Sequence, residues 1–451
     1  MARLFGTDGV RGIANQELDG VLAFKLGKYG ARVLREHFGK DGNVMISHDG
    51  RISADMLVSA LAAGFCSEGM DVYLAGLLPT PGLAHVVKNG DYALGVMVSA
   101  SHNTFEYNGI KFFNHNGEKL SDALEDEIEA LVMGTIADLD YKKGKDLGRI
   151  QFHNYVPQEY LQFLIQQFPI EGRGRKLGID CANGATQELA VDLFTALGFE
   201  ITVVKGIFSN GMNINDSCGS THPEFLARSV EASDCDLGIA FDGDGDRIIA
   251  VDRKGKVIDG DQILAVLALA SKKLGKLKNN TLVATMMSNL GLIEFTEKNG
   301  INLELTNVGD RYVLAKMLEE DLNLGGEQSG HIILRDYQAT GDGMLSALAL
   351  IYALDELDMD LSEVDDIIRI YPQVMKNVHV SNKVKPLIQE DMGLQNLILQ
   401  METELDGKGR VFLRPSGTEP VIRVMTEADS MEMAENVTDT LVRYIEKCYT
   451  K

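Results

Sequence analysis

The order of the predicted strands and helices constrains the fold of this chain more than any other feature. In the first third, the predicted strands are 43–47, 71–75 and 94–98. A segment between them, 54–67, has the apolar spacing of a helix. This alternation predicts a layered α/β domain. It starts again after the polar stretch 138–148, and once more from residue 261.

The second and third rounds of this pattern have their own predicted elements. In the second, helices are predicted at 155–167 and 185–197, and strands at 176–180, 200–205 and 237–241. In the third, helices are predicted at 261–274, 291–298, 310–318 and 341–357, and strands at 281–285 and 303–306.

After Tyr371-Pro372 the order of elements changes. The predicted elements there are strands 374–380, 410–413 and 421–427, and helices 385–405 and 430–447. A chain of 451 residues is too long for a single core. We therefore predict three consecutive α/β/α layered domains followed by a small α+β domain. The predicted domain ranges are 1–152, 153–257, 258–371 and 372–451.

The charge of the chain limits its partners. It has 43 basic and 66 acidic side chains, for a formal net charge of −23. Such a charge argues against a nucleic-acid or anionic-membrane surface. An anionic substrate would have to be bound by a few well-placed Arg and Lys side chains.

The cysteines and the N-terminal residues indicate a cytoplasmic location. The five cysteines are scattered and lack the paired spacing of a metal site, so we expect reduced thiols. Residues 1–6 lack a basic stretch followed by an apolar core, and the longest apolar run, 344–354, is shorter than a bilayer span. We therefore expect a soluble protein that is not exported.

Three aspartates follow the predicted strand 237–241. Asp242, Asp244 and Asp246 alternate with glycine, so a tight loop can turn several carboxylates inward. Carboxylate oxygens suit a hard divalent cation such as Mg²⁺. Three carboxylates also leave coordination positions open for a phosphate oxygen, as in magnesium-dependent phosphoryl transfer.

The sequence of this loop has two other interpretations. In a calcium-binding EF-hand that starts at Asp242, the sixth residue is glycine and the twelfth is glutamate, but the chain has Arg247 and Arg253 there. The EF-hand interpretation therefore fails. A solvated acidic turn remains as the alternative, because Asp-Gly pairs are common in turns.

A serine follows the predicted strand 94–98 and is the candidate nucleophile. Ser101 is followed by His102 and Asn103, and by Lys111 ten residues on. Considered alone, the segment is typical of a turn that ends a strand. It lacks the Gly-x-Ser-x-Gly frame of a hydrolase, and the chain has no Gly-Lys-Ser/Thr phosphate loop. Acyl transfer and nucleotide triphosphate binding are therefore not indicated.

Two further loops have ligand-binding character. The segment 414–420, Arg-Pro-Ser-Gly-Thr-Glu-Pro, combines a guanidinium, hydroxyls and small residues, which suits a phosphate; a turn with a surface arginine is the alternative. The segment 325–331, Gly-Gly-Glu-Gln-Ser-Gly-His, would suit sugar hydroxyls or an amine. His331 by itself is more typical of a structural histidine.

The four loops occur in the order found in the α-D-phosphohexomutases, and the chain resembles this family over essentially its whole length. Finer features resemble the branch of the family that acts on glucosamine phosphates. These features are 5–12 (Phe-Gly-Thr-Asp-Gly-Val-Arg-Gly), 213–215, 218–223, 308–313 and Gln328. One departure is Thr104, where many relatives outside this branch have proline.

The resemblance implies that the four domains are arranged around a central cleft, and it implies a role for each loop. Ser101 would become phosphoserine, and Asp242, Asp244 and Asp246 would bind one Mg²⁺ together with an oxygen of that phosphate. His102 and Lys111 would be the candidate bases. The other implied contacts are Glu327 and Ser329 with sugar hydroxyls; Arg414, Ser416, Gly417, Thr418 and Arg423 with the non-reacting phosphate; and Arg11, Lys111, Arg311 and His331 around the transferring group, with Arg11 stabilising charge.

The activity implied by the resemblance is a phosphoglucosamine mutase reaction. D-Glucosamine 6-phosphate and α-D-glucosamine 1-phosphate would interconvert through a bound glucosamine 1,6-bisphosphate, in the route to UDP-N-acetylglucosamine and cell-wall precursors. The alternatives are a phosphomannomutase or phosphoglucomutase, a sugar-phosphate phosphatase, and a non-catalytic sensor of sugar phosphates. A homodimer is possible.

Overall fold

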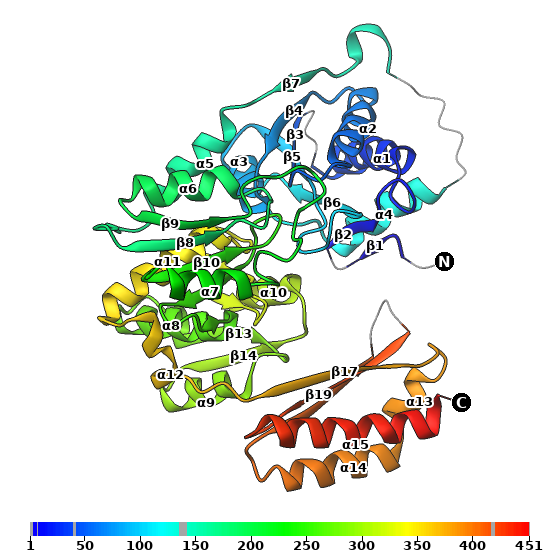
Figure 1. Ribbon diagram of the computed structural model, residues 1–451. Coiled ribbons are helices and arrows are strands. Elements are labelled where there is room, and N and C mark those ends of the chain that lie inside the picture. The colour runs from blue at the N-terminus through cyan, green and yellow to red at the C-terminus, as the bar shows by residue number, and fades with distance from the viewer. Residues whose placement is uncertain (1–2, 7, 39–41, 135–141, 416–419, 451) are drawn as a thin grey trace. The chain divides into compact units, whose positions relative to one another are not determined.

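The structure is a computed structural model, and it describes residues 3–6, 8–38, 42–134, 142–415 and 420–450. These residues form two compact units. One comprises Met1–Met287 with Ile301–Val364, and the other comprises Ser288–Gly300 with Asp365–Lys451. Three of the sheets formed by the described residues belong to the first unit and one belongs to the second (Figure 1).

The first sheet carries the serine loop. Its strand order is β1 (Phe5–Gly6), β2 (Gly9–Ile13), β6 (Tyr107–Asn114), β5 (Tyr92–Val98), β3 (Asn43–His48), β4 (Val72–Leu77) and β7 (Ile150–Phe152). Strands β5, β3, β4 and β7 run parallel, whereas β1, β2 and β6 pair antiparallel. The helices of this part of the chain are α1 (Gly20–Phe38), α2 (Ala54–Ser67), α3 (Thr80–Asn89) and α4 (Asp122–Met133).

Helices cover both faces of this sheet. Leu94, Val96 and Val98 of β5 share a core with residues of α1, α2 and α4. Successive residues of a strand point to opposite faces. At Gly95, on the other face, an added Cβ would lie 2.8 Å from the Val87 side chain of α3. Helix α3 therefore covers the face opposite α1, α2 and α4.

The second sheet carries the aspartate loop. Its order is β12 (Val257–Ile258), β11 (Ile248–Asp252), β10 (Leu237–Phe241), β8 (Lys176–Asp180) and β9 (Glu200–Lys205). Strand β8 is parallel to β9 and β10, and β11 is antiparallel to β10. The accompanying helices are α5 (Val156–Ile165), α6 (Gln187–Ala196) and α7 (Glu224–Ala232). All five residues of β10 are buried, as expected for a central strand.

The third sheet carries the 325–331 loop. Its order is β14 (Asn302–Thr306), β13 (Thr281–Thr285), β15 (Leu324–Gly326) and β16 (Ile332–Leu334). The helices of the same unit here are α8 (Gly260–Lys273), α10 (Asp310–Glu319) and α11 (Gly343–Leu357). Helix α8 begins with a capping box. The Asp259 side chain accepts from the N–H of Gln262, and the Gln262 side chain accepts from the N–H of Asp259.

The second unit contains a three-stranded antiparallel sheet in the order β17 (Gln373–His379), β19 (Val421–Glu427), β18 (Arg410–Pro415). Its helices are α9 (Leu290–Lys298), α13 (Lys385–Gln389), α14 (Met392–Glu404) and α15 (Met431–Tyr449), and the short α12 (Val364–Ile367) lies at the boundary of the two units. One face of α14 and α15 packs with the strands around Ile422, Val424 and Leu441.

This architecture confirms the predicted fold class of three α/β/α layers and a small α+β domain. The single helix predicted at 385–405 is wrong: the segment forms α13 and α14, and the Asp391 side chain caps α14 by accepting from the N–H groups of Gly393 and Leu394. Strand β6 was not predicted. None of the helices in the described part of the chain combines the length and the apolar composition needed to cross a membrane.

Candidate active site

Ser101 lies just beyond the end of β5, in the turn predicted from the sequence. Its side chain is buried, and its backbone is left-handed, with a φ of 52°. The hydroxyl donates a hydrogen bond to Oδ2 of Asp242 at 2.7 Å, and its oxygen lies 3.4 Å from Nδ1 of His102. The structure therefore brings the serine loop of the first sheet against the aspartate loop of the second.

The aspartate loop depends on its glycines. Gly245 has a φ of 71°, a conformation that residues with a side chain rarely adopt. An added Cβ at Gly243 would lie 2.7 Å from the carbonyl oxygen of Ser101. Glycine at Gly243 thus allows the two loops to approach each other, and glycine at Gly245 allows the sharp turn between the aspartates.

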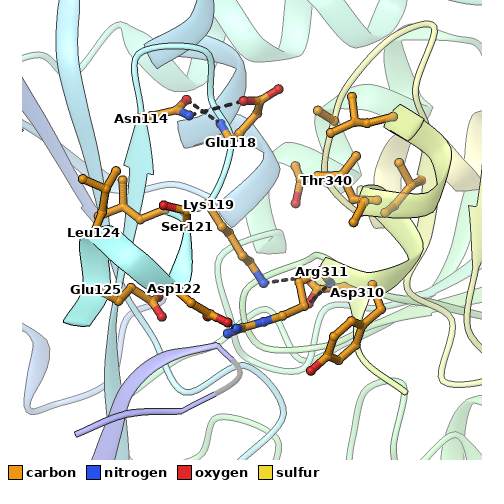
Figure 2. Close-up of a pocket in the computed structure, with 17 residues that line it drawn as sticks. Asn114, Glu118, Lys119, Ser121, Asp122, Leu124, Glu125, Asp310, Arg311 and Thr340 are labelled. Carbon is orange, nitrogen blue, oxygen red and sulfur yellow. Dashed lines mark hydrogen bonds and ion pairs between the residues drawn. The ribbon is translucent and has the colours of Figure 1, made fainter. Parts of the chain in front are cut away.

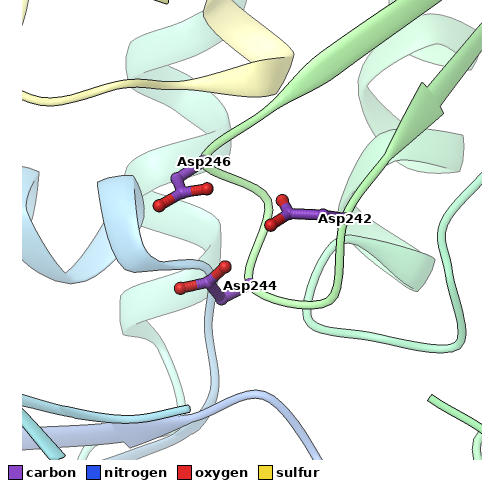
Figure 3. A group of neighbouring side chains, drawn as sticks. All are labelled: Asp242, Asp244 and Asp246. Atoms are coloured by element: carbon purple, nitrogen blue, oxygen red, sulfur yellow. The ribbon is translucent and has the colours of Figure 1, made fainter. Parts of the chain in front are cut away.

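The three aspartates form a buried acidic cluster (Figure 3). One carboxylate oxygen from each of Asp242, Asp244 and Asp246 lies within 4.8 Å of the others. Oδ1 of Asp244 and Oδ1 of Asp246 are buried and accept no hydrogen bond within the described residues. Burial, together with the charges of Asp246 and Asp244, holds the pKa of Asp242 well above its usual range. Oxygen ligands with unused lone pairs in such a cluster fit a hard divalent cation such as Mg²⁺.

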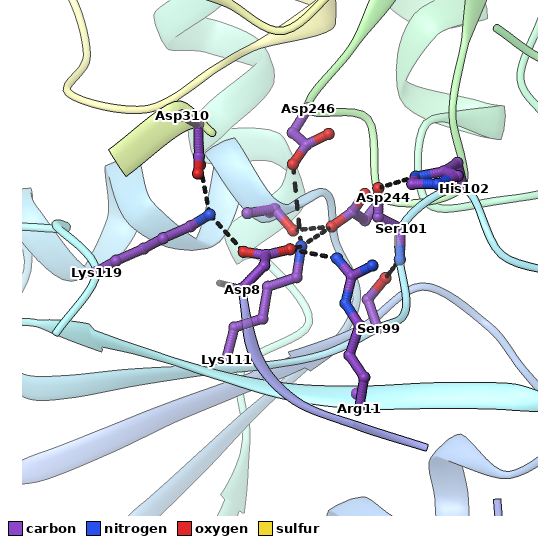
Figure 4. A network of polar contacts seen from close by, with 12 residues as sticks. Asp8, Arg11, Ser99, Ser101, His102, Lys111, Lys119, Asp244, Asp246 and Asp310 are labelled. Atoms are coloured by element: carbon purple, nitrogen blue, oxygen red, sulfur yellow. Dashed lines mark hydrogen bonds and ion pairs between the residues drawn. The ribbon is translucent and has the colours of Figure 1, made fainter. Parts of the chain in front are cut away.

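Lys111, on β6, lies beside this cluster (Figure 4). Its Nζ is 2.8 Å from Oδ2 of Asp244, 2.9 Å from Oδ2 of Asp8 and 3.9 Å from Oδ2 of Asp246. Burial alone would lower the pKa of Lys111, but these carboxylates raise it above its usual value. Lys111 is therefore an ammonium ion in this structure.

A second lysine extends the network of charges. Lys119 contacts both Asp8 and Asp310 (Figure 4). Burial opposes ionisation of Asp8, but Lys111, Lys119 and Arg11 together hold its pKa well below the usual range. The network thus links the N-terminal segment, β6 and the start of α10.

His331 is the last residue of the loop between β15 and β16 and is almost fully buried. Its Nδ1 lies 3.6 Å from Asp246, its Nε2 lies 3.6 Å from Asp310, and Gly341 donates its N–H to Nε2 at 3.1 Å. Burial opposes protonation, but the two carboxylates raise the pKa of His331. The structure thus places His331 between Asp246 of the acidic cluster and Asp310.

His102 has the opposite electrostatic environment. Burial, together with the positive charges of Arg247 and Arg11, lowers its pKa to about 4. Its imidazole is therefore neutral at pH 7, with Nδ1 at 3.4 Å from the Ser101 hydroxyl oxygen.

The two arginines expected around the transferring group have carboxylate partners. Arg11 contacts Asp8. Arg311 contacts Asp122, and its Nη2 donates to the carbonyl oxygen of Gly6 at 3.1 Å. Arg11 joins the network around Lys111, whereas Arg311 lies at its margin.

The predicted sugar loop lies between β15 and β16. Oε1 of Glu327 accepts from the N–H of Gly309 at 3.0 Å, and Ser329 is exposed. The Gln328 side chain donates to Asp259 at 3.2 Å, so it supports the start of α8. Ser329 thus lies away from the buried acidic cluster. Burial opposes the charge of Arg247, whereas Glu327, like Asp246 and Asp242, raises the pKa of that residue.

The predicted phosphate loop belongs to the second unit. Arg414 on β18 is directly opposite Arg423 on β19. Burial and the charge of Arg423 lower the pKa of Arg414. Two facing guanidinium groups suit an anion. Ser416, Gly417 and Thr418, the other residues predicted for this loop, lie outside the described residues.

A cavity of about 470 Å³ lies beside the charge network (Figure 2). It is lined by Lys119, Asp310 and Arg311 together with aliphatic side chains such as Leu124 and Leu314. Among the predicted site residues that the structure describes, only Arg311 lines it. The cavity is therefore distinct from the serine and aspartate loops.

Some residues of the site were not predicted from the sequence. Asp8 and Asp310 lie in the segments 5–12 and 308–313, which carry part of the resemblance, but no role was predicted for either residue. A charged residue in a glycine-containing segment is the sequence signal that could have identified them. Thr80 donates its hydroxyl to Oδ2 of Asp244 at 2.6 Å, and its N–H to the carbonyl oxygen of Asp244 at 2.9 Å. Nothing in the sequence around Thr80 indicated this contact.

Comparison with known families gives matches along the chain. Models of the phosphoglucomutase/phosphomannomutase family match in order: alpha/beta/alpha domain I at residues 2–136, domain II at 158–255, domain III at 259–371, and the C-terminal domain at 375–443.

Curated relatives match over nearly the whole chain. A phosphoglucosamine mutase of Caldicellulosiruptor saccharolyticus is 48% identical over 449 residues, which cover 99% of each chain. One of Bacillus cereus is 47% identical over 445 residues, which cover 99% of this chain and 98% of the relative.

Solved structures share the fold. A phosphoglucomutase/phosphomannomutase family protein of Burkholderia thailandensis matches with a TM-score of 0.79 and 24% identity, covering 99% of this chain and 97% of the other. N-acetylphosphoglucosamine mutase of Aspergillus fumigatus, in complex with GlcNAc-6P and magnesium, matches with a TM-score of 0.71 and 19% identity, covering 98% and 95%.

Proposed function

Because the chain belongs to the phosphoglucomutase/phosphomannomutase family, we propose that it interconverts D-glucosamine 6-phosphate and α-D-glucosamine 1-phosphate. The amino sugar is inferred from the curated relatives, which are phosphoglucosamine mutases similar along their whole length. The reaction would pass through a phosphoserine at Ser101 and a bound glucosamine 1,6-bisphosphate.

One observation carries this proposal: the hydroxyl of Ser101 donates to Asp242 within the buried acidic cluster. A phosphate on this oxygen would lie beside three carboxylates, and like charges at this distance repel strongly in a buried site. Such a group is stable only with nearby positive charge. Lys111 supplies one positive charge at Asp244.

A divalent cation would supply the rest. Asp242, Asp244 and Asp246, with an oxygen of the phosphoserine, are the residues that would hold Mg²⁺. The bound ion would supply Lewis-acid stabilisation of the charge on the phosphoryl oxygens.

In the first half of the reaction, a free hydroxyl of the sugar monophosphate attacks the phosphorus atom on Ser101. A new O–P bond forms, the bond from phosphorus to Ser101 Oγ breaks, and the sugar becomes a 1,6-bisphosphate. The proton of the attacking hydroxyl goes to a base, and a proton returns to Ser101 Oγ, so the proton count is unchanged. We propose that His102, whose Nδ1 lies 3.4 Å from Ser101 Oγ, takes part in proton transfer at that oxygen, and that Lys111, beside Asp244, is the cation that stabilises charge.

In the second half, the bisphosphate has turned so that its other phosphate faces Ser101, and that phosphate is transferred back to the serine. Arg414 and Arg423, with Ser416, Gly417 and Thr418, would hold whichever phosphate is not reacting. Glu327 and Ser329 would bind sugar hydroxyls. The phosphate loop must therefore bind phosphate without selecting the sugar carbon that bears it.

Specificity constants test the proposed substrate. kcat/KM should be higher for glucosamine 6-phosphate than for mannose 6-phosphate or glucose 6-phosphate, measured with the matching 1,6-bisphosphate as activator. A higher constant for mannose or glucose phosphate would reassign the substrate while keeping the reaction class. Release of inorganic phosphate without any 1-phosphate would instead indicate a phosphatase.

A further inference from the structure

The backbone of Ser101 is held in an unfavourable conformation. Its φ of 52° lies in the left-handed region, which non-glycine residues seldom occupy. Such a conformation persists only where the surrounding structure imposes it. The groups that impose it therefore determine where the hydroxyl of Ser101 points.

The first of these groups is Arg51, whose side chain is 0% exposed. Its Nη2 donates to the carbonyl oxygens of Ser101 at 2.9 Å and Asn103 at 2.8 Å. Its Nη1 donates to the carbonyl oxygen of Tyr107 at 3.0 Å and also contacts that of Thr104. The planar guanidinium has five donors in a fixed fork, and here it spans the whole turn that follows Ser101.

The carboxylate of Asp49 completes this arrangement. Its Oδ2 accepts from Nε of Arg51 at 2.8 Å and from the hydroxyl of Ser99 at 2.6 Å. The Ser99 hydroxyl in turn accepts from the N–H of Ser101 at 2.8 Å. Arg51 and Asp49 thus bind both the carbonyl and, through Ser99, the N–H of Ser101, which forms a closed ring of hydrogen bonds.

The second group is Asn215, which comes from the part of the chain that forms the second sheet. Its Nδ2 donates to the carbonyl oxygen of Ser101 at 2.8 Å and to that of Asn103 at 2.9 Å. Its own N–H donates to the carbonyl oxygen of Ala182, just beyond β8, at 2.9 Å. The part of the chain that carries the aspartate loop therefore also binds the backbone of the serine loop through hydrogen bonds.

We propose that Arg51 and Asn215 are positioning residues that hold the carbonyl oxygens of Ser101 and Asn103 from two sides and so direct Ser101 Oγ at Asp242. Neither side chain contacts Ser101 Oγ, so both act through the backbone of the serine loop. The inference rests on the proposed role of Ser101 as the phosphate carrier. Arg51 fixes the turn within the first domain, and Asn215 sets its place relative to the metal-binding aspartates.

Asn215→Ala tests this inference most directly, with Arg51→Lys as a second variant that keeps the charge but loses the fork. Asn323→Ala is the matched control, because Asn323 is also buried and its Nδ2 holds a loop carbonyl, that of Lys276, at 2.9 Å. The readouts are kcat, KM for glucosamine 6-phosphate, and the rate at which glucosamine 1,6-bisphosphate phosphorylates Ser101, followed by intact mass.

Both variants should lose kcat by about 10- to 100-fold, because a displacement of about 1 Å in a reacting group has an effect of this size. The rate of Ser101 phosphorylation should fall in proportion, and KM should change by less than about threefold, since phosphate and sugar contacts remain. Asn323→Ala should lower thermal stability while kcat stays within about twofold of the wild type.

A folded Asn215→Ala protein with wild-type kcat would overturn the inference, and so would a raised KM at unchanged kcat, which would indicate a substrate contact. If Arg51→Lys does not fold, Asn215→Ala decides alone. The wild-type protein separates this inference from the proposed function: failure of the wild type to form phosphoserine or to isomerise the sugar would refute the function itself.

Discussion

Lys111 and Asp244 form a buried ion pair, with 2.8 Å between Nζ and Oδ2 and with side chains that are 1% and 0% exposed. Asp242 and Asp246 lie in the same cluster, so the ammonium group offsets only part of its negative charge. A group of charges buried in this way is stable only if paired. The proposed dication would offset the negative charge that Lys111 leaves uncompensated.

The first prediction concerns the metal. Chelation with EDTA should abolish activity, and Mg²⁺ should restore it, because the carboxylate cluster lacks sufficient positive charge. The substitution Asp244→Asn removes one carboxylate ligand. It should therefore weaken Mg²⁺ binding by at least about tenfold, as measured by calorimetry. Asp355→Asn, which removes a surface ion pair with Arg175, is the control and should bind Mg²⁺ normally. Activity that is indifferent to chelation would contradict the metal assignment.

The second prediction concerns the nucleophile. Ser101→Ala should lower kcat by about 1000-fold or more while the protein remains folded, because the variant lacks the hydroxyl that is proposed to carry the phosphate. The check is a mutase assay alongside thermal unfolding. Ser229→Ala is a suitable control, since that hydroxyl only donates to the carbonyl of Phe225 one turn earlier in helix α7. Near-normal turnover by Ser101→Ala would remove the nucleophile assignment.

The third prediction concerns the phosphate loop. Arg414→Ala should raise KM for glucosamine 6-phosphate by about 10- to 150-fold, the equivalent of about 1.5–3 kcal/mol for a charged hydrogen bond. Steady-state kinetics provide the measurement. Arg443→Ala removes an exposed arginine of α15 in the same unit and should leave KM unchanged. If KM is the same for wild type and Arg414→Ala, the non-reacting phosphate binds elsewhere.

The fourth prediction concerns stability and pH. Burial raises the pKa of Glu125 to about 7, although Arg311 and Arg3 oppose this. The folded state thus binds the Glu125 proton more tightly than the unfolded state, in which the pKa of this carboxyl group is 4.5. The contribution of protonated Glu125 to the free energy of unfolding is fully present below pH 4.5 and is lost as the pH rises through about 7.

Glu125→Gln should remove this dependence. The stability of wild type relative to Glu125→Gln should fall by about 1–3 kcal/mol between pH 4.5 and pH 8, as measured by urea unfolding of both proteins at each pH. Because both proteins share every other titrating group, the difference isolates Glu125. Parallel pH profiles for the two proteins would show that Glu125 ionises normally.

Much of the fold could be predicted from sequence, and so could the position of the candidate serine and aspartate loops directly after buried strands. The strand predicted at 237–241 coincides with β10, because five apolar residues before an Asp-Gly turn are typical of a buried strand. Strand β6 was missed because Asn108 and Lys111 interrupt its apolar pattern. Their burial depends on partners that are distant in the chain, namely Ser53 for Asn108, and Asp8 and Asp244 for Lys111.

The residues that hold the backbone of Ser101 could not be predicted either, because they too are distant from it in the chain. Arg51 and Asn215 are 50 and 114 residues from Ser101 in the sequence. Their hydrogen bonds go to backbone carbonyls, which every residue possesses. A sequence motif can mark a nucleophile or a metal ligand by residue type, but a side chain that holds a distant backbone leaves no such local pattern.

The most direct test of the proposed function follows the phosphate itself. Protein labelled with ³²P at Ser101, with the position checked by peptide mapping, is mixed with unlabelled glucosamine 6-phosphate in the presence of Mg²⁺. The label should leave Ser101 and appear in glucosamine 1,6-bisphosphate and then in the monophosphates, together with unlabelled glucosamine 1-phosphate. Label released as inorganic phosphate, or retained on the protein while glucosamine 1-phosphate forms, would contradict the phosphoserine mutase mechanism.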